Sequence, residues 1–136
     1  MGSVEPDRER LRSRLTQALG ARPEILLAVL HGSFVRGEAY RDIDVGVWLD
    51  AATLSRDERF RFVLDLSVEL RLTLGHPVDV RALNDAPLGF RYHALAGAPL
   101  VTRDDEFLAE LRARTWDEYL DFQPFARQYL REALRE

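Results

Sequence analysis

The chain has 136 residues, of which 46% are hydrophobic and 31% are charged, and its formal net charge is −4. This length and composition predict one globular domain spanning residues 1–136, and the absence of cysteine excludes disulfides, thiolate zinc sites and thiol nucleophiles. The negative charge disfavours direct binding to nucleic acid, and without a secretory signal pattern or an apolar run of membrane-spanning length we expect a cytoplasmic protein.

The N-terminal part is predicted to hold a helix and a buried strand. The helix extends from Arg8 to Leu19, with Asp7 as its cap and Gly20 at its end. Its apolar face consists of Leu11, Leu15, Ala18 and Leu19. A short apolar run from Glu24 to Leu30, bounded by turn residues, predicts a central strand.

The middle of the chain is predicted to contain a turn, a strand and a long helix. The segment His31–Gly37 reads as a turn that leads into a short helix, and Ile43–Leu49 as the second strand. Ser55 to Glu58 is a capping box before a helix that extends to Leu74 and stops at Gly75. Its apolar positions recur at helical spacing: Phe60, Val63, Leu66, Leu70 and Leu74.

The last third is predicted to be strand, helix, strand and a helical tail. Pro77–Leu83 is the third strand, residues 86–97 form a short helix, and Pro99–Thr102 is one more strand. The tail is helical from Asp105 to Leu134, with Pro124 breaking or kinking it. This order of elements predicts an α+β (layered α/β) domain with helices packed on a sheet.

Gly32 and Ser33 follow directly after the first predicted strand. Backbone N–H groups at the start of a helix, together with a serine hydroxyl, can bind an anion such as a phosphate, and glycine lets the backbone approach it closely. Alone the pair is more typical of an ordinary turn. His31, just before it, could contact a phosphate or be a partly buried, hydrogen-bonded histidine.

Asp42 and Asp44 lie two residues apart at the start of the second predicted strand. Residues with this spacing share a face of a strand, so the two carboxylates would repel each other unless a cation is present. Magnesium takes carboxylate oxygens together with substrate phosphates. The pair therefore indicates a metal site, with a solvated strand edge as the alternative.

Asp79 lies between two valines in the third predicted strand. A buried carboxylate needs a partner. If this strand lies beside that of Asp42, three carboxylates converge and could hold two metal ions for an in-line phosphoryl displacement. The alternative is a surface pair of Asp79 and Arg81 on an edge strand.

Together these motifs resemble the minimal nucleotidyltransferases of the DNA polymerase β superfamily. The resemblance rests on Gly32-Ser33 with Arg36 and Gly37, then Asp42-Ile-Asp44, then Asp79, and it extends from about Ile25 to Tyr129. It implies a nucleotidyltransferase fold, with a small mixed sheet flanked by helices and a C-terminal helical tail. The segment between Ser33 and Asp42 is shorter than is usual in the family, and Arg41 stands where a serine or threonine is common.

The resemblance also implies roles for individual residues. Ser33 would contact the β and γ phosphates of ATP, and Gly32 and Gly37 would shape the phosphate loop. Asp42 and Asp44 would ligate both Mg²⁺ ions. Asp79 would ligate the ion on the acceptor side and help to deprotonate the attacking hydroxyl. Arg36 matches a basic position of the family and is either a substrate contact or part of a structural ion pair.

Many stand-alone members of this family are antitoxins paired with a HEPN-domain ribonuclease toxin. The resemblance implies that this chain moves AMP from ATP onto a tyrosine hydroxyl of such a toxin. An adenylyl group adds bulk and negative charge, and both oppose RNA binding. Tyr92, Tyr119, Phe122, Phe125 and Tyr129 cluster in the last third of the chain, and core packing explains most of them. An exposed remainder on the C-terminal helix would be a docking surface for a partner.

Two other functions stay open. The chain could neutralise a toxin by stoichiometric contact, with a vestigial nucleotide site, as the shortened loop suggests. It could also be an aminoglycoside-type nucleotidyltransferase, although a drug-modifying enzyme usually needs more chain to enclose its acceptor.

Overall fold

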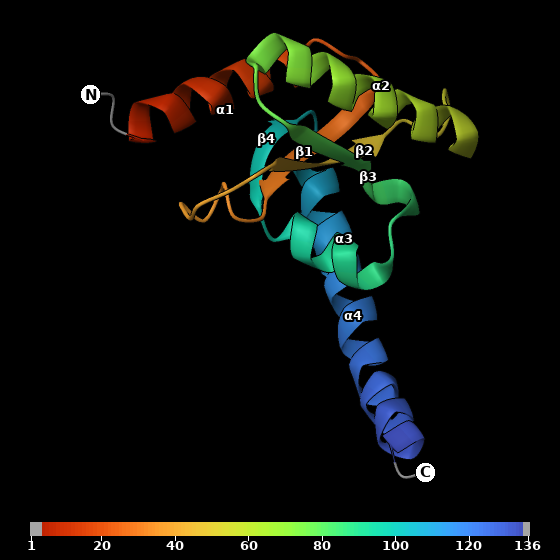
Figure 1. The fold of residues 1–136 in the computed structure, drawn as a ribbon. Helices are drawn as coiled ribbons and strands as arrows, with labels where there is room; N and C mark the ends of the chain where they lie inside the picture. Colours follow the sequence, from red (N-terminus) through yellow and green to blue (C-terminus); the bar gives the residue numbers. More distant parts are fainter. Residues whose placement is uncertain (1–3, 135–136) are drawn as a thin grey trace.

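The computed structural model describes residues 4–134. Its elements are α1 (Val4–Gly20), β1 (Ile25–His31), β2 (Ile43–Leu49), α2 (Arg56–Leu74), β3 (Val78–Ala82), the short 3-10 helix η1 (Leu83–Asp85), α3 (Leu88–Leu95), β4 (Ala98–Thr102) and α4 (Asp105–Leu134). One four-stranded sheet carries α1 and α2 on one face and α3 and the start of α4 on the other (Figure 1). The predicted layered α+β fold is confirmed.

The strand order of the sheet is β3-β2-β1-β4. β1 pairs antiparallel with both β2 and β4, while β2 and β3 are parallel. A parallel pair needs a crossover connection, and α2 provides it. β1 is thus an interior strand, as its apolar run predicts, whereas β3 is at the edge.

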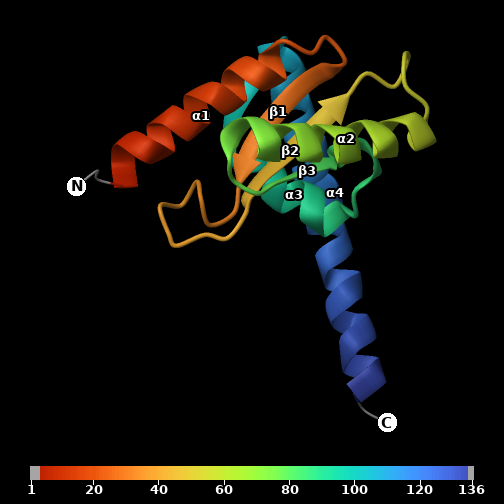
Figure 2. The same ribbon diagram turned by 45° about the horizontal axis from the view of Figure 1, so that its top comes forward.

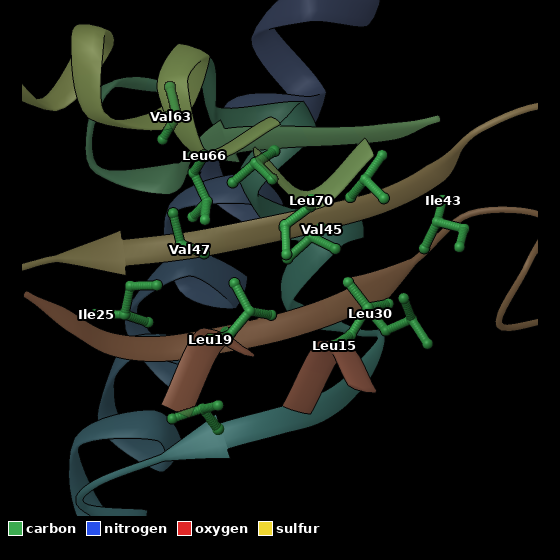
Figure 3. Close-up of a cluster of buried hydrophobic side chains, with 14 of the residues drawn as sticks. Leu15, Leu19, Ile25, Leu30, Ile43, Val45, Val47, Val63, Leu66 and Leu70 are labelled. Atoms are coloured by element: carbon green, nitrogen blue, oxygen red, sulfur yellow. The ribbon is translucent and has the colours of Figure 1, made fainter. Parts of the chain in front are cut away.

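Hydrophobic side chains fill both sides of the sheet. Ala28 and Leu30 of β1 face the cluster under α1 and α2, while Leu27 and Val29 face the cluster under α3 and α4. Alternate residues of a strand point to opposite faces, so a strand covered on both sides is apolar throughout. The first cluster (Figure 3) includes Leu15, Leu19, Ile25, Ile43, Val45, Val47, Val63, Leu66 and Leu70.

α2 begins and ends where the sequence predicts. Ser55 is the N-cap, its side chain accepts from the Glu58 N–H, and both halves of the capping box are formed. Gly75 ends the helix in the left-handed conformation, at φ 68°. The prediction of Phe60 on the apolar face is wrong, because its side chain is 65% exposed, and the buried face is carried by Val63, Leu66 and Leu70.

The two ends of the fold differ from the predictions. α1 starts at Val4, so Asp7 lies inside the helix and does not cap it. α4 is one helix of 30 residues that continues through Pro124, so of the predicted break or kink the break does not occur. A proline removes one backbone hydrogen bond, and the turns on either side keep the helix continuous. The second half of α4 projects away from the sheet (Figures 1 and 2).

No helix within residues 4–134 is long and apolar enough to cross a membrane.

Candidate active site

The segment after β1 is a compact loop, and the short helix predicted there is absent. Gly32 and Gly37 have φ of 81° and 78°, and a left-handed residue cannot belong to a right-handed helix. The loop closes on itself through Arg36 N–H to the Gly32 carbonyl at 3.3 Å and Glu38 N–H to the Ser33 carbonyl at 3.0 Å. A helix N-terminus therefore does not contribute to anion binding here. The candidate hydrogen-bond donors to an anion are the backbone N–H groups of the loop and the Ser33 hydroxyl.

Arg8 of α1 holds this loop in place. Its guanidinium donates to the Phe34 carbonyl and to the Glu38 carbonyl, both at 2.6 Å. It also lies over the rings of Phe34 and Tyr40, at 5.2 Å and 4.8 Å from their centroids. Sequence reasoning missed this residue, because the Arg8–Phe34 contact spans 26 positions and no local motif marks it.

Asp44 and Asp79 are paired across two neighbouring strands. In the parallel register of β2 and β3, Asp44 is opposite Asp79, and in the antiparallel register of β1 and β2, Asp44 is opposite His31. Asp42 is exposed and comes one residue before β2 begins. The Gly32-Ser33 turn follows His31 at the same end of the sheet. The placement of Asp79 beside Asp44 agrees with the arrangement that the sequence predicts.

The electrostatics of this end of the sheet are unfavourable for a bare carboxylate. The pKa of Asp44 is raised, first by burial and then by repulsion from the carboxylates of Asp79 and Asp42. Arg81 and Arg36 act in the opposite direction but do not cancel the shift. A bound cation would relieve this repulsion.

Gly32 makes room for the Asp44 carboxylate. A β-carbon at position 32 would collide with Asp44 Oδ2, and the positive φ adds backbone strain for any other residue. Gly37 has the same kind of φ, but a β-carbon there would meet nothing within 4 Å. Glycine is therefore required for different reasons at the two positions. At position 32 it allows the close approach of a carboxylate, and at position 37 it allows only the positive φ that the chain direction needs.

Asp79 is less buried than its flanking valines suggest. Its side chain is 42% exposed and accepts from Arg81 Nε at 3.2 Å. The prediction of a buried carboxylate is thus wrong, and the surface pair of Asp79 and Arg81 on an edge strand is what the structure contains. The valines on either side face α2, while the open edge of β3 leaves Asp79 accessible.

Arg36 projects from the loop into the same region. It forms an ion pair with Glu38 at 2.7 Å and reaches Ser33 Oγ at 3.5 Å. Its pKa is raised, chiefly by the hydrogen bond to Glu38 and to a smaller extent by Asp44. Arg36 is therefore in a structural ion pair, while its guanidinium also reaches the Ser33 hydroxyl.

His31 is partly buried and lies opposite Asp44 on the neighbouring strand. Burial lowers its pKa, Asp79 opposes that shift and Arg81 adds to it, so the surroundings favour the neutral imidazole. Its Nε2 is buried without a hydrogen-bond partner. Of the two predictions for His31, the partly buried, hydrogen-bonded histidine is therefore wrong in its hydrogen bond. The ring packs edge-on against Phe90, with centroids 5.4 Å apart.

The donor set fits magnesium in chemistry. Carboxylate oxygens are the ligands that Mg²⁺ prefers, and the raised pKa of Asp44 reflects a repulsion that a cation would remove. Among residues 4–134, however, no three His, Cys, Asp or Glu side chains are already grouped to hold a metal ion. For Asp79 to bind the metal ion, its carboxylate would have to give up the ion pair with Arg81.

Beside Asp79 the surface is hollowed into a groove of about 500 Å³. Its walls come from α2, from β3 and from the segment leading into α3. The lining includes Arg56, Phe60, Val63, Leu64, Asp79, Val80, Arg81, Ala82, Asp85, Ala86, Pro87 and Phe90.

Comparison with known proteins shows which family the sequence belongs to. The sequence profile described as "Polymerase beta, Nucleotidyltransferase" matches residues 13–106. No curated protein sequence matches the chain.

Solved structures share the whole fold at low sequence identity. One is a toxin–antitoxin crystal structure with AMP-PNP, with a TM-score of 0.72 and 22% identity over 92% of this chain and 98% of that one. Another is the MNT antitoxin in complex with a tri-AMPylated HEPN toxin from Shewanella oneidensis, with a TM-score of 0.71 and 21% identity over 95% and 99%. The toxin–antitoxin MntA-HepT has a TM-score of 0.70 and 20% identity over 94% and 99%.

The family match covers well over half of the chain and includes the loop and all three aspartates. This protein is therefore a member of the polymerase β nucleotidyltransferase family.

Proposed function

We propose that this chain is a Mg²⁺-dependent nucleotidyltransferase that moves AMP from ATP to a tyrosine hydroxyl of a partner HEPN ribonuclease toxin, and so acts as its antitoxin. The observation that carries the proposal is the register of Asp44 opposite Asp79, at the end of the sheet where the Gly32-Ser33 loop lies. The similar complexes, one with AMP-PNP and one with an AMPylated toxin, support the choice of nucleotide and acceptor.

The proposed roles follow from these positions. Asp42, Asp44 and Asp79 would hold two Mg²⁺ ions, which would supply charge neutralisation for the triphosphate and the leaving pyrophosphate. The loop from Gly32 to Gly37 would receive the β and γ phosphates, with Ser33 and Arg36 as donors. Asp79 would accept the proton of the attacking hydroxyl. Catalysis would come mainly from positioning and electrostatics.

The second half of α4 is the proposed docking surface for the toxin. That half projects from the domain (Figure 2), and from Trp116 onward α4 exposes five large apolar side chains: Trp116, Leu120, Phe122, Phe125 and Tyr129. Phe125 and Tyr129 are 71% and 72% exposed. Phe122, Phe125 and Tyr129 recur at helical spacing on one face of α4, and exposed apolar residues gathered on one face mark protein interaction sites.

A second candidate is a binding module that neutralises the toxin by contact alone. The specific observation in its favour is the same α4 surface, which needs no nucleotide chemistry to bind a partner.

Co-expression with the HEPN-domain protein that is the proposed partner tests the two candidates. The wild-type chain is expected to restore growth and to leave the toxin heavier by whole AMP units in its intact mass. The Asp42→Asn/Asp44→Asn double variant should bind the toxin but leave its mass unchanged and growth arrested. Growth restored by the double variant, with an unmodified toxin, would instead establish the binding module.

A further inference from the structure

We propose that the groove beside Asp79 is the acceptor site, and that it takes the aromatic side chain that carries the attacking hydroxyl in preference to a polycationic sugar. This inference rests on the proposed nucleotidyl transfer and adds the residues that select the acceptor. The groove has a volume of about 500 Å³, within the range of about 300–1,000 Å³ typical of small-ligand sites.

The groove is continuous with the reaction site. Asp79, on the acceptor side of the proposed chemistry, is itself part of the lining, and its neighbours Val80 and Arg81 continue the wall. Asp44, opposite Asp79 in the sheet, is outside the lining. A group in the groove would therefore approach the acidic pair from the Asp79 side, opposite to the phosphate loop across β2.

The walls suit an aromatic ring. Phe60 and Leu64 of α2 are 65% and 51% exposed, so the groove has apolar surface that no other part of the described chain covers. Phe90 faces them from α3, with the Arg81 guanidinium 5.1 Å from its ring centroid. Aromatic rings pack favourably against such apolar and cationic neighbours.

The charges of the groove disfavour a polycation. Asp85 is neutralised by Arg59, which donates to its two carboxylate oxygens at 2.9 Å and 2.8 Å and thereby lowers the pKa of the carboxyl. Arg81 is paired with Asp79 at 3.2 Å, and Arg56 lies 4.0 Å from Asp85. Three guanidinium groups, with that of Arg59, therefore meet two carboxylates at the groove and leave an excess of positive charge. An amino-sugar carries several ammonium groups, which these guanidinium groups would repel. A phenol, which becomes more negative as its proton leaves, would be attracted.

The open edge of β3 is partly closed to an added strand. Val80 N–H already donates to Ser67 Oγ at 3.0 Å. An acceptor backbone that tried to pair with β3 would lose that hydrogen bond. The occupant is therefore recognised through its side chain and not through strand addition.

Transfer of AMP to the phenol forms one bond and breaks one. The phenolic oxygen forms a bond to the α-phosphorus of ATP, and the bond from that phosphorus to the bridging α–β oxygen breaks. The electron pair leaves with pyrophosphate, and the phenolic proton passes to the Asp79 carboxylate and then to solvent. The products are an O-adenylyl tyrosine and pyrophosphate, with no oxidant or reductant needed.

Direct binding of a minimal acceptor tests the groove without relying on activity. N-acetyltyrosinamide and, separately, kanamycin would be titrated into the isotope-labelled protein with Mg²⁺ and a non-transferable ATP analogue. We expect amide shifts at Leu64, Arg81 and Phe90 with tyrosinamide, none at Leu72, and none at these groove residues with kanamycin. Absence of tyrosinamide shifts, or stronger kanamycin shifts in the groove, would overturn the proposal.

Two matched double variants of α2 give the second arm. Phe60→Ser/Leu64→Ser changes the groove, and Val68→Ser/Leu72→Ser changes side chains of similar exposure (60% and 79%) on the same helix outside it. With tyrosinamide and labelled ATP, the groove variant is expected to raise the KM for the acceptor at least about tenfold and leave the KM for ATP unchanged. The Val68/Leu72 variant should behave as wild type.

The possible outcomes separate this inference from the proposed function. Equal effects of both variants on the KM for tyrosinamide would assign the loss to α2 as a whole and not to the groove, and would overturn the proposal. If the groove variant transfers nucleotide to tyrosinamide as well as the wild type does, the acceptor role of the groove is overturned, while the proposed function stands. No transfer to tyrosinamide or to the HEPN protein, despite binding in the groove, would overturn both the transfer and the acceptor role.

Discussion

Asp44 and Asp79 are direct neighbours across the parallel pair of β2 and β3, although 35 positions separate them in sequence. α2 creates this relationship because it carries the chain from the end of β2 back to the start of β3. Both aspartates are the second residue of their strand, so the parallel register brings them to the same end of the sheet. The fold thus places two like charges together, and the raised pKa of Asp44 records the cost.

Substitution Asp44→Asn is expected to stabilise the protein at neutral pH while abolishing its activity. The pKa of Asp44 is raised in the folded state. As pH falls, the Asp44 carboxylate is therefore protonated at a higher pH in the folded protein than in the unfolded chain, and the ionised carboxylate destabilises the fold at pH 7. The stability advantage of the variant should be largest at neutral pH, shrink as pH falls through the folded pKa and vanish below the ordinary value of 3.8. Denaturant unfolding of both proteins between neutral and acidic pH measures this. A variant that is less stable than wild type at pH 7 would contradict the repulsion.

Substitution Gly32→Ala is expected to damage the site beyond its effect on the backbone. The added β-carbon meets the Asp44 carboxylate, and φ of 81° adds strain. Gly75→Ala is the matched control, because it has φ of 68° and nothing within 4 Å of the added carbon. Both should lose about 1 kcal/mol from the left-handed conformation, measured by urea unfolding. Only Gly32→Ala should also lose Mg²⁺-dependent ATP binding, and equal ATP affinity in the two variants would argue against the close approach.

Substitution Arg8→Ala is expected to loosen the phosphate loop. It removes the two hydrogen bonds to the Phe34 and Glu38 carbonyls, each worth about 1 kcal/mol. ATP affinity, measured by calorimetry, should fall by about tenfold. Arg10→Ala, an exposed position on the same helix, serves as the control and should leave ATP affinity unchanged. If the Arg8 variant binds ATP like wild type, the loop does not depend on α1.

Substitution Phe125→Ser/Tyr129→Ser is expected to weaken the toxin complex and leave the fold intact. Both side chains are more than two-thirds exposed, at 71% and 72%, so their removal creates no cavity. We expect the Kd for the HEPN protein to rise at least about tenfold, while transfer to N-acetyltyrosinamide is unchanged. Unaltered Kd would place the toxin on another surface.

Local patterns in the sequence predict much of the fold. β2 is predicted to the residue, and α2 follows from its capping box and from Gly75, because caps and apolar periodicity are local signals. After β1 the predicted turn is present but the short helix expected to follow it is not, because the positive φ of Gly32 and Gly37 depends on how the chain turns toward β2. The sequence alone does not reveal that the two glycines are left-handed.

The candidate site is predicted in part for a similar reason. The three aspartates and Ser33 are recognisable as a motif, and the adjacency of Asp44 and Asp79 follows once β2 and β3 are paired. The exposure of Asp79 depends on β3 being an edge strand, and strand order is a property of the whole sheet. Arg8 and Phe90 reach the site through tertiary packing, which no local pattern marks.

Transfer of labelled nucleotide tests the central claim most directly. Purified protein, Mg²⁺, α-labelled ATP and the HEPN protein would be mixed, and label on that protein and released pyrophosphate would be quantified for the wild type and for Asp44→Asn. We predict equal amounts of label and pyrophosphate with the wild type, and a rate lower by at least about 10²–10³-fold with the variant, as expected when electrostatic stabilisation is lost. A folded wild-type protein that binds the HEPN protein tightly yet transfers no label would contradict the account.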